Sequence, residues 1–392
     1  MIKPKAAHAV DHDVLLNTAR LDSQGVEVSW KDEVSRAHFS PFWLRDHCHS
    51  EESLNRETLQ RQVDTFAIAK DIAPAKVEIA DAGRTLRVTW ANDGTVSVFP
   101  AEFLWQISQN EGRERAPRRT LWDRASMGKN FPSVSHEEVL RSDAALLRWL
   151  SLAEEFGFAL TTGASASVAD LETLVKRVGY VRQTIFGGMW EFSANMAFKD
   201  TAYTSVGIGP HTDGTYSIDS PGFQMFQCLA FDGTGGDSTL VDGFKVAETI
   251  RKTDPKAFEV LTEVKVPAHY LGDGVHLRAE HTVISLDHNG DLRQIAYNNY
   301  DRAPFRLPVS QMTEFYRALA LFHRLINDPA YEISMRLLPG TVLFFDNWRT
   351  LHGRHAFEGH RHMSGAYLNK EDVDSKLRVL RATQGTGPGP NR

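Results

Sequence analysis

Cysteine is nearly absent from this chain of 392 residues, which contains only Cys48 and Cys228. Two thiols cannot form the disulfide framework of a small secreted domain, so we expect a reducing compartment, the cytoplasm, with a mitochondrial location left open. No apolar run approaches the roughly 18 residues that a membrane span requires, and the first residues lack the apolar core of a secretory signal. A large excess of one charge is also missing, since the formal net charge is −6. We therefore expect neither nucleic acid nor membrane as a partner.

The order of the secondary-structure signals predicts two domains. Residues 1–110 alternate apolar and polar side chains around glycine-containing turns, which is typical of half-buried antiparallel strands. Residues 111–134 are basic and aperiodic and are interpreted as a linker, and residues 383–392 as a disordered tail. Residues 135–382 carry two early helices and then mainly strands. The expected fold class is mainly β with α: a β-barrel or sandwich braced by helices, with a small β-rich N-terminal domain.

Three helices of the larger domain have clear sequence signals. Ser135 and Glu138 have the spacing of a capping box ahead of a helix that Gly157 should end. Ser167 and Asp170 open the next helix in the same way. A long amphipathic helix follows later, marked by apolar residues at three- and four-residue steps: Met312, Phe315, Leu319, Phe322 and Ile326.

The segment GPHTDGTY places His211 and Asp213 two residues apart, so on an extended strand both side chains point to the same side. A third ligand would complete a metal site, and His352, just after the apolar stretch TVLFF, is a candidate. Two histidines and one carboxylate form the facial triad of non-haem Fe(II) oxygenases, which leaves positions open for a cosubstrate and dioxygen. On spacing alone the alternative is a solvated turn with an unrelated histidine. The rival third ligands are His136, His281, His355 and His362.

Arg361 strengthens the oxygenase hypothesis. It lies shortly after His352 on an expected strand, and an arginine is the side chain suited to bind the distal carboxylate of 2-oxoglutarate in a bidentate manner. A hydroxyl often assists such an arginine, and Ser238 and Thr239 are the candidates. The alternative is a solvated arginine on a strand.

Aromatic residues gather in the sequence around these positions. Aromatic faces can bind a cation that offers no N–H donor, through cation–π attraction. The same residues would equally serve as barrel core. The candidates are Phe186, Trp190, Tyr203, Tyr216 and Tyr367.

Long motifs make the chain recognisable. The stretches GIGPHTDGTYSIDSPGFQMFQCLAF, YNNYDRAPF and DNWRTLHGRHAFEGHRHMSGAYL resemble the γ-butyrobetaine hydroxylase and trimethyllysine hydroxylase family, within the taurine-dioxygenase-like superfamily. The resemblance extends over nearly the whole chain. It implies a distorted double-stranded β-helix (jelly-roll) catalytic domain and a homodimer. It also implies Fe(II) on His211, Asp213 and His352, 2-oxoglutarate on Arg361, dioxygen as oxidant and ascorbate as a reductant.

The resemblance also assigns substrate positions. Trp190 and Tyr203 fall on positions of an aromatic cage, and Phe186 stands where the family more often has tyrosine. Asp200 matches the trimethyllysine branch, where a carboxylate can pair with the α-ammonium that γ-butyrobetaine lacks. Asn299, with Asn298 beside it, is expected to bind the substrate carboxylate. The family implies hydroxylation of N6,N6,N6-trimethyllysine at C3, as in carnitine biosynthesis.

One family feature is missing. Relatives often hold a structural zinc in the N-terminal domain through several cysteines and a histidine, whereas here only Cys48 is left, with Ser50 and Ser53 nearby and Thr95 in the approximate place of the histidine. One thiolate cannot form a four-ligand zinc site, so we expect no structural zinc.

Three other functions compete with trimethyllysine hydroxylation. The chain could instead encode a γ-butyrobetaine dioxygenase, or a hydroxylase of another quaternary ammonium compound. A betaine-binding module without catalysis is the non-enzyme alternative, although such a module has no use for three metal ligands. A protein or peptide hydroxylase has no specific signal in its favour.

Overall fold

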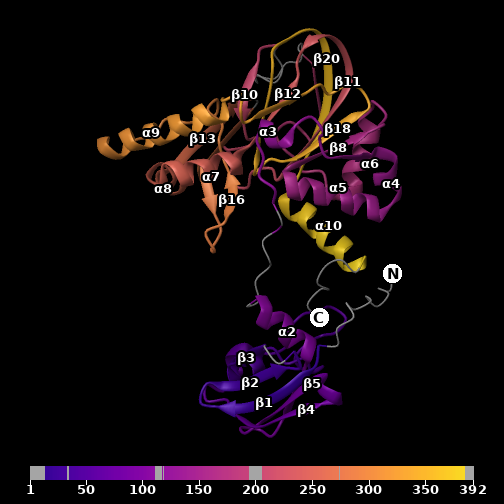
Figure 1. The fold of residues 1–392 in the computed structure, drawn as a ribbon, viewed down its shortest axis with the longest axis vertical. Coiled ribbons are helices and arrows are strands. Elements are labelled where there is room, and N and C mark those ends of the chain that lie inside the picture. The colour runs from indigo at the N-terminus through magenta and orange to yellow at the C-terminus, as the bar shows by residue number, and fades with distance from the viewer. Residues whose placement is uncertain are drawn as a thin grey trace. The chain divides into compact units, whose positions relative to one another are not determined.

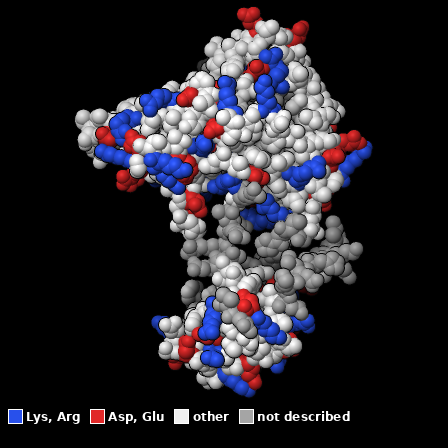
Figure 2. All heavy atoms as spheres, in the orientation of Figure 1, with Lys and Arg blue, Asp and Glu red and all other residues white. Residues whose placement is uncertain are grey.

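The computed structural model describes residues 14–32, 35–110, 117, 119–193, 205–272 and 274–384. The chain divides into two compact units, residues 1–116 with 382–392 and residues 117–381. Figure 2 shows basic and acidic side chains interspersed over the visible face of each unit, in keeping with the small net charge. In the described part of the chain, no helix combines the length and apolar character needed to cross a membrane.

The described residues of the N-terminal unit form two small antiparallel sheets, two α-helices and two short 3-10 helices (Figure 1). The predicted turn-rich segment folds as the meander β4-β5-β6, and Val88 and Trp90 of its central strand are buried with Val28 and Trp30 of the other sheet. The sheet order is β1-β2-β3 and β4-β5-β6. The elements are β1(Leu16–Asp22), β2(Gly25–Trp30), β3(Arg36–Phe39), α1(Pro41–Asp46), β4(Pro74–Ala80), β5(Thr85–Trp90), β6(Val96–Pro100) and α2(Ala101–Asn110).

The larger unit has two principal sheets that face one another, which confirms the jelly-roll prediction. The six-stranded sheet has the order β7-β8-β18-β11-β20-β9 and the four-stranded sheet the order β10-β19-β12-β17. Phe345 and Met363 of the first sheet pack with Leu240 and Ile333 of the second in one buried cluster. These strands are β7(Ser133–Ser135), β8(Phe158–Thr162), β9(Met189–Ser193), β10(Ile208–His211), β11(Phe223–Gly235), β12(Ser238–Asp242), β17(Glu332–Met335), β18(Thr341–Asp346), β19(Thr350–Arg354) and β20(Phe357–Leu368).

Helices and two hairpins brace this core. In Figure 1, α4, α5 and α6 lie beside the six-stranded sheet, where Trp149 of α5 packs on Phe344 of β18. Helices α7, α8 and α9 share a second cluster with Val241 and Leu351 of the smaller sheet. The helices are α3(Arg124–Met127), α4(His136–Arg141), α5(Asp143–Phe156), α6(Val168–Val178), α7(Gly243–Thr253), α8(Pro255–Glu263), α9(Val309–Ile326) and α10(Lys370–Thr383). The hairpins join β13(Lys265–Gly272) to β14(Val275–Thr282) and β15(Ile284–Leu286) to β16(Leu292–Ile295).

Two local expectations change at the start of this unit. Ser135 makes no side-chain capping bond, and the first helix is interrupted at Ser142, whose hydroxyl accepts from the Ala145 N–H at 3.3 Å and begins α5. Gly157 ends α5 in a left-handed conformation, as predicted. Residues 119–134, placed in the linker by composition, contribute the buried Trp122, α3 and the first two residues of β7 to the larger unit. A single buried tryptophan and a three-residue strand are too short to produce a periodic pattern of apolar residues, so the sequence did not reveal them.

Candidate metal centre and its cavity

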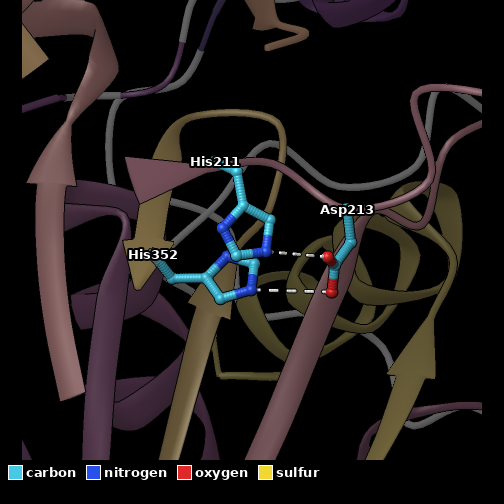
Figure 3. Close-up of side chains that lie close together, drawn as sticks. All are labelled: His211, Asp213 and His352. Atoms are coloured by element: carbon cyan, nitrogen blue, oxygen red, sulfur yellow. Dashed lines mark ion pairs between the residues drawn. The ribbon is translucent and has the colours of Figure 1, made fainter. Parts of the chain in front are cut away.

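Three polar side chains meet where two strands of the smaller sheet pair. His211 is the last residue of β10 and lies opposite His352 of β19 in the antiparallel register. Asp213 follows two residues after His211 and turns back toward both rings (Figure 3). The imidazole centroids are 4.3 Å apart. Strand pairing therefore brings together two histidines that are distant in sequence, because directly opposed side chains on one face of a ladder are neighbours.

The donor atoms of these residues converge. His211 Nε2 lies 3.3 Å from Asp213 Oδ1, and His352 Nε2 lies 3.5 Å from Asp213 Oδ2. Neighbouring ligand atoms on an octahedral ion, each at about 2.1 Å, are roughly 3 Å apart, so the spacing fits a shared metal. His211 Nδ1 donates to the Gly209 carbonyl at 2.9 Å, which leaves Nε2 as its lone-pair donor. Two imidazoles and a carboxylate are a donor set suited to Fe(II).

The electrostatics also favour a bound cation. Burial alone would raise the pKa of Asp213, but the charge and hydrogen bonds of His352 and His211 outweigh it and hold that pKa well below its ordinary value. Burial would lower the pKa of His211, yet its contact with Asp213 raises it. Burial, reinforced by the charge of His211, lowers the pKa of His352. The site thus favours an ionised carboxylate beside two imidazoles, a combination suited to a bound cation.

The rival histidines are engaged elsewhere. His136 bonds Thr161, and His281 bonds the Ser217 carbonyl at 2.7 Å. His355 and His362 form ion pairs with glutamates, Glu332 and Glu191 respectively. Among the residues that the structure describes, the only other cluster with metal-ligand geometry is Asp22, Glu27 and His38, which lies at the surface of the N-terminal unit.

Side chains from other elements hold Asp213 in place. The amide of Asn347 accepts from the Asp213 N–H at 2.8 Å and donates to the Asp213 carbonyl at 3.0 Å and to the Pro221 carbonyl at 2.9 Å. The Tyr367 hydroxyl donates to Asp213 Oδ2 at 2.8 Å. Such partners orient a metal ligand and limit its movement.

A cavity of about 300 Å³ opens beside the triad. Arg361 of β20 lines it although only 6% of the residue is exposed, and it makes no hydrogen bond or ion pair with any described residue. Burial, with a further contribution from the nearby Arg354, lowers the pKa of Arg361 to about 10. A buried guanidinium without a carboxylate partner is costly, so the cavity is suited to a ligand that carries an acidic group.

Only one of the two predicted hydroxyls reaches this cavity. Ser238 is part of the lining, whereas Thr239 is not. Successive side chains of β12 point to opposite faces: Leu240 packs in the inner cluster and Val241 in the outer one. Thr239 has the parity of Val241 and does not line the cavity that Arg361 lines.

Four of the predicted aromatic residues line the cavity, namely Phe186, Trp190, Tyr216 and Tyr367. Trp190 lies against Gly365, where an added Cβ would come within 2.1 Å of its ring, so the strand needs glycine at that position. Sequence reasoning did not identify four other aromatic members of the lining: Phe192, Phe226, Tyr270 and Tyr300. Asp200 and Tyr203, which were also predicted to bind the substrate, lie outside the described residues.

The polar end of the cavity also differs from expectation. Asn298 lines it, whereas Asn299 is exposed and does not, so the amide at the cavity belongs to the residue beside the predicted one. Asp301, Arg354 and Gln224 line it as well and were not predicted. No signal in a single sequence identifies them, because two come from an irregular loop and from a strand end, and Gln224 lies on a strand otherwise read as core.

The surroundings of Cys48 do not fit zinc. Its buried thiol accepts from the Ser50 N–H at 3.4 Å, and the Ser50 hydroxyl donates to that of Ser53 at 3.1 Å. Burial raises the pKa of Cys48, but hydrogen bonds with Ser50 and Ser97 outweigh this and lower it. Thr95 is exposed and bonds Asp93 instead. One thiol among hydroxyls lacks the soft donor set of a structural zinc site.

Comparisons with known proteins place this geometry in context. The model of the taurine catabolism dioxygenase TauD, TfdA family matches residues 120–367, and that of the gamma-butyrobetaine hydroxylase-like N-terminal family matches residues 18–111. A trimethyllysine dioxygenase of Meyerozyma guilliermondii is 35% identical, covering 95% of this chain and 96% of that protein. The human mitochondrial trimethyllysine dioxygenase is 34% identical, with 90% and 85% covered. A gamma-butyrobetaine dioxygenase of Pseudomonas sp. strain AK-1 is 32% identical, with 93% and 96% covered.

Proposed function

Because the chain belongs to the TauD, TfdA dioxygenase family, we propose that it is an Fe(II)- and 2-oxoglutarate-dependent hydroxylase of a trimethylammonium amino acid. The preferred substrate in this proposal is N6,N6,N6-trimethyllysine, hydroxylated at C3. The observation that carries it is the convergence, in one cavity, of the histidine–carboxylate triad, the buried Arg361 and several aromatic faces.

His211, Asp213 and His352 would hold the metal, which fits their donor set and spacing. When bound, the iron supplies the activation of dioxygen, with 2-oxoglutarate converted to succinate and CO2 as the substrate C–H bond is hydroxylated. Arg361 would anchor the distal carboxylate of 2-oxoglutarate, with the Ser238 hydroxyl as a further donor. The Tyr367 hydroxyl, by donating to Asp213 Oδ2, keeps that carboxylate turned toward the histidines.

The remaining lining residues position the substrate. Trp190 and Phe186 offer π faces to the trimethylammonium group, joined in the proposal by Tyr203, while Asn298 serves the polar end. Tyr216 contacts Tyr270 at 5.5 Å between ring centroids and closes the cavity on that side. Positioning of one methylene at the metal is the protein's main contribution to the rate, because a fixed approach replaces a random encounter.

The second candidate is γ-butyrobetaine hydroxylation, which is supported by the 32% identity to a gamma-butyrobetaine dioxygenase. A betaine-binding module without turnover is the non-enzyme alternative. One assay distinguishes these three functions. The protein is incubated with Fe(II), 2-oxoglutarate, ascorbate and a panel of quaternary ammonium compounds, and succinate and a 16-dalton gain in substrate mass are measured.

The expected result is turnover of trimethyllysine, with no turnover by the His352→Ala variant. Turnover of γ-butyrobetaine alone would replace the substrate assignment. If the compounds bind tightly but none of them leads to succinate formation, only the hypothesis of a betaine-binding module remains.

The proposal also includes a cytoplasmic homodimer, as the family resemblance implies. Analytical ultracentrifugation of the purified protein and fractionation of the producing cells test these two points. A sedimentation coefficient that corresponds to a monomer at micromolar concentration would contradict the dimer.

A further inference from the structure

Thr212 lies between two of the metal ligands in the chain, yet its side chain serves a different contact. The residue is only 2% exposed and is not part of the cavity lining. Its N–H donates to the Tyr297 carbonyl at 2.8 Å, and its hydroxyl accepts from the Tyr297 N–H at 3.0 Å and lies 3.4 Å from the same carbonyl. These contacts fasten the metal-binding segment to the chain that follows β16.

Tyr297 is a firm base for this attachment because it is anchored in the helical layer. It is buried, and its ring packs against that of Phe322 on α9, with 5.2 Å between the centroids. Its hydroxyl lies 2.7 Å from Nδ1 of His323 on the same helix. A buried side chain with both apolar packing and a polar partner has a defined position.

The residues after Tyr297 form part of the cavity wall. Asn298 and Tyr300 both line the cavity, and Asn298 Oδ1 accepts from the Tyr300 N–H at 3.0 Å. Tyr300 returns to β10, where its hydroxyl accepts from the Gly209 N–H at 3.1 Å and its ring meets the His211 ring edge-on. This stretch therefore touches the metal-binding segment at two points. The Thr212 contact is buried and the Gly209 contact is exposed to water, so the first constrains the stretch more strongly.

We propose that Thr212 is a positioning residue that sets the distance between the metal and the polar end of the substrate. This inference rests on the proposed function, in which Asn298 serves that polar end. Hydroxylation at one methylene requires a fixed spacing between the group that holds the substrate and the metal, and a misplacement of about 1 Å can cost about 100-fold in rate. Thr212 acts on this spacing through Tyr297 and contacts the substrate at no point.

The test replaces the hydroxyl and keeps the shape of the side chain. Thr212→Val leaves the Tyr297 N–H buried without its partner, whereas Thr212→Ser keeps the hydroxyl. Thr161→Val is the matched control, because Thr161 is also fully buried, its hydroxyl contacts His136 Nδ1 at 3.1 Å, and it is not part of the cavity lining. If Thr212→Val does not fold, Thr212→Ala takes its place, since the smaller side chain lets water reach the Tyr297 N–H.

Two kinds of measurement are made on each variant. Isothermal titration of the Co(II)-loaded protein gives the affinities for trimethyllysine and for 2-oxoglutarate, and urea denaturation gives the stability. Turnover with Fe(II), 2-oxoglutarate and trimethyllysine gives the amount of hydroxylated product per succinate. Ascorbate is present as the reductant that turnover without hydroxylation consumes.

We expect Thr212→Val to weaken trimethyllysine binding about 5- to 30-fold and to lower the product formed per succinate at least about twofold. The affinity for 2-oxoglutarate should stay unchanged, because Arg361 lies on β20 and takes no part in these contacts. Thr212→Ser should behave like the wild type, and Thr161→Val should lose stability alone.

Two results would overturn the role of Thr212 while the proposed function stands. One is a folded Thr212 variant without the hydroxyl that keeps the wild-type affinity and product ratio, and the other is a Thr161→Val variant that shows the same changes. A wild-type protein that neither binds nor hydroxylates trimethyllysine would overturn the proposed function as well.

Discussion

Replacement of Asn347 should loosen the metal site without touching a metal ligand. The Asn347 side chain is almost fully buried and makes three hydrogen bonds, two of them to the backbone of Asp213. In Asn347→Ala, the Asp213 N–H and two carbonyls lose their partners inside the protein. At about 1 kcal/mol for each bond, we expect the unfolding free energy to fall by about 3 kcal/mol. We also expect Asp213 to move, because its backbone is no longer clamped.

Metal affinity is the measurement that separates positioning from stability. Loss of a group that orients a metal ligand typically weakens binding about 10- to 100-fold. The apoprotein is titrated with Co(II), which reports its coordination by visible absorption, and with Fe(II) under anaerobic conditions. Urea denaturation of the same samples gives the stability.

A second amide provides the control. Asn369 accepts from Arg182 at 2.9 Å and donates to Asp372 at 3.1 Å, and neither partner belongs to the triad. Asn369→Ala should reduce stability and leave the metal dissociation constant unchanged. If Asn347→Ala remains folded and binds Co(II) within about twofold of wild type, the positioning role fails.

Two further predictions concern the same cavity, and a third concerns the N-terminal unit. Arg361→Ala should raise the KM for 2-oxoglutarate by about 100-fold, because a bidentate charged contact is lost, and Arg361→Lys should restore part of the loss. An unchanged KM would mean that the cosubstrate binds elsewhere. Trp190→Leu should weaken trimethyllysine binding about 2- to 30-fold, but not binding of the neutral tert-butyl isostere, as isothermal titration would show. Metal analysis of the chelator-treated protein should find no stoichiometric zinc at Cys48. Zinc that persists after chelation would contradict the conclusion that one thiol among serine hydroxyls cannot form a structural zinc site.

The strand-parity argument does not explain Asp213, which lies beyond the end of β10. Sequence reasoning nevertheless selected three residues that the structure brings together, because β19 pairs with β10 and places His352 opposite His211. It failed where a register or loop path decides. Ser238 and Thr239 are equivalent in sequence, yet only the pairing of β12 shows which one faces inward. The same holds for Asn298 and Asn299, whose directions depend on an irregular loop.

The succession of strand signals predicted a barrel or sandwich braced by helices, and the family resemblance supplied the jelly-roll class. The break at Ser142 was not predicted, because Ser135 has an equally good cap pattern and only packing distinguishes them. Asp301 was invisible for a different reason: a lone loop carboxylate is usually solvated, and its place beside Asn298 arises from contacts with β13 and β10.

The two kinds of metal ligand are held by different forces, and this explains the sensitivity expected at Asn347. His211 and His352 are opposite one another in a β-ladder, so backbone pairing fixes their separation. Asp213 lies beyond the end of β10 and has no ladder partner. Its position depends on side-chain contacts from Asn347 and Tyr367 instead. Changes at those two residues should therefore alter the carboxylate and spare the histidine pair, so that a variant retains a two-histidine site with weaker affinity rather than losing the metal outright.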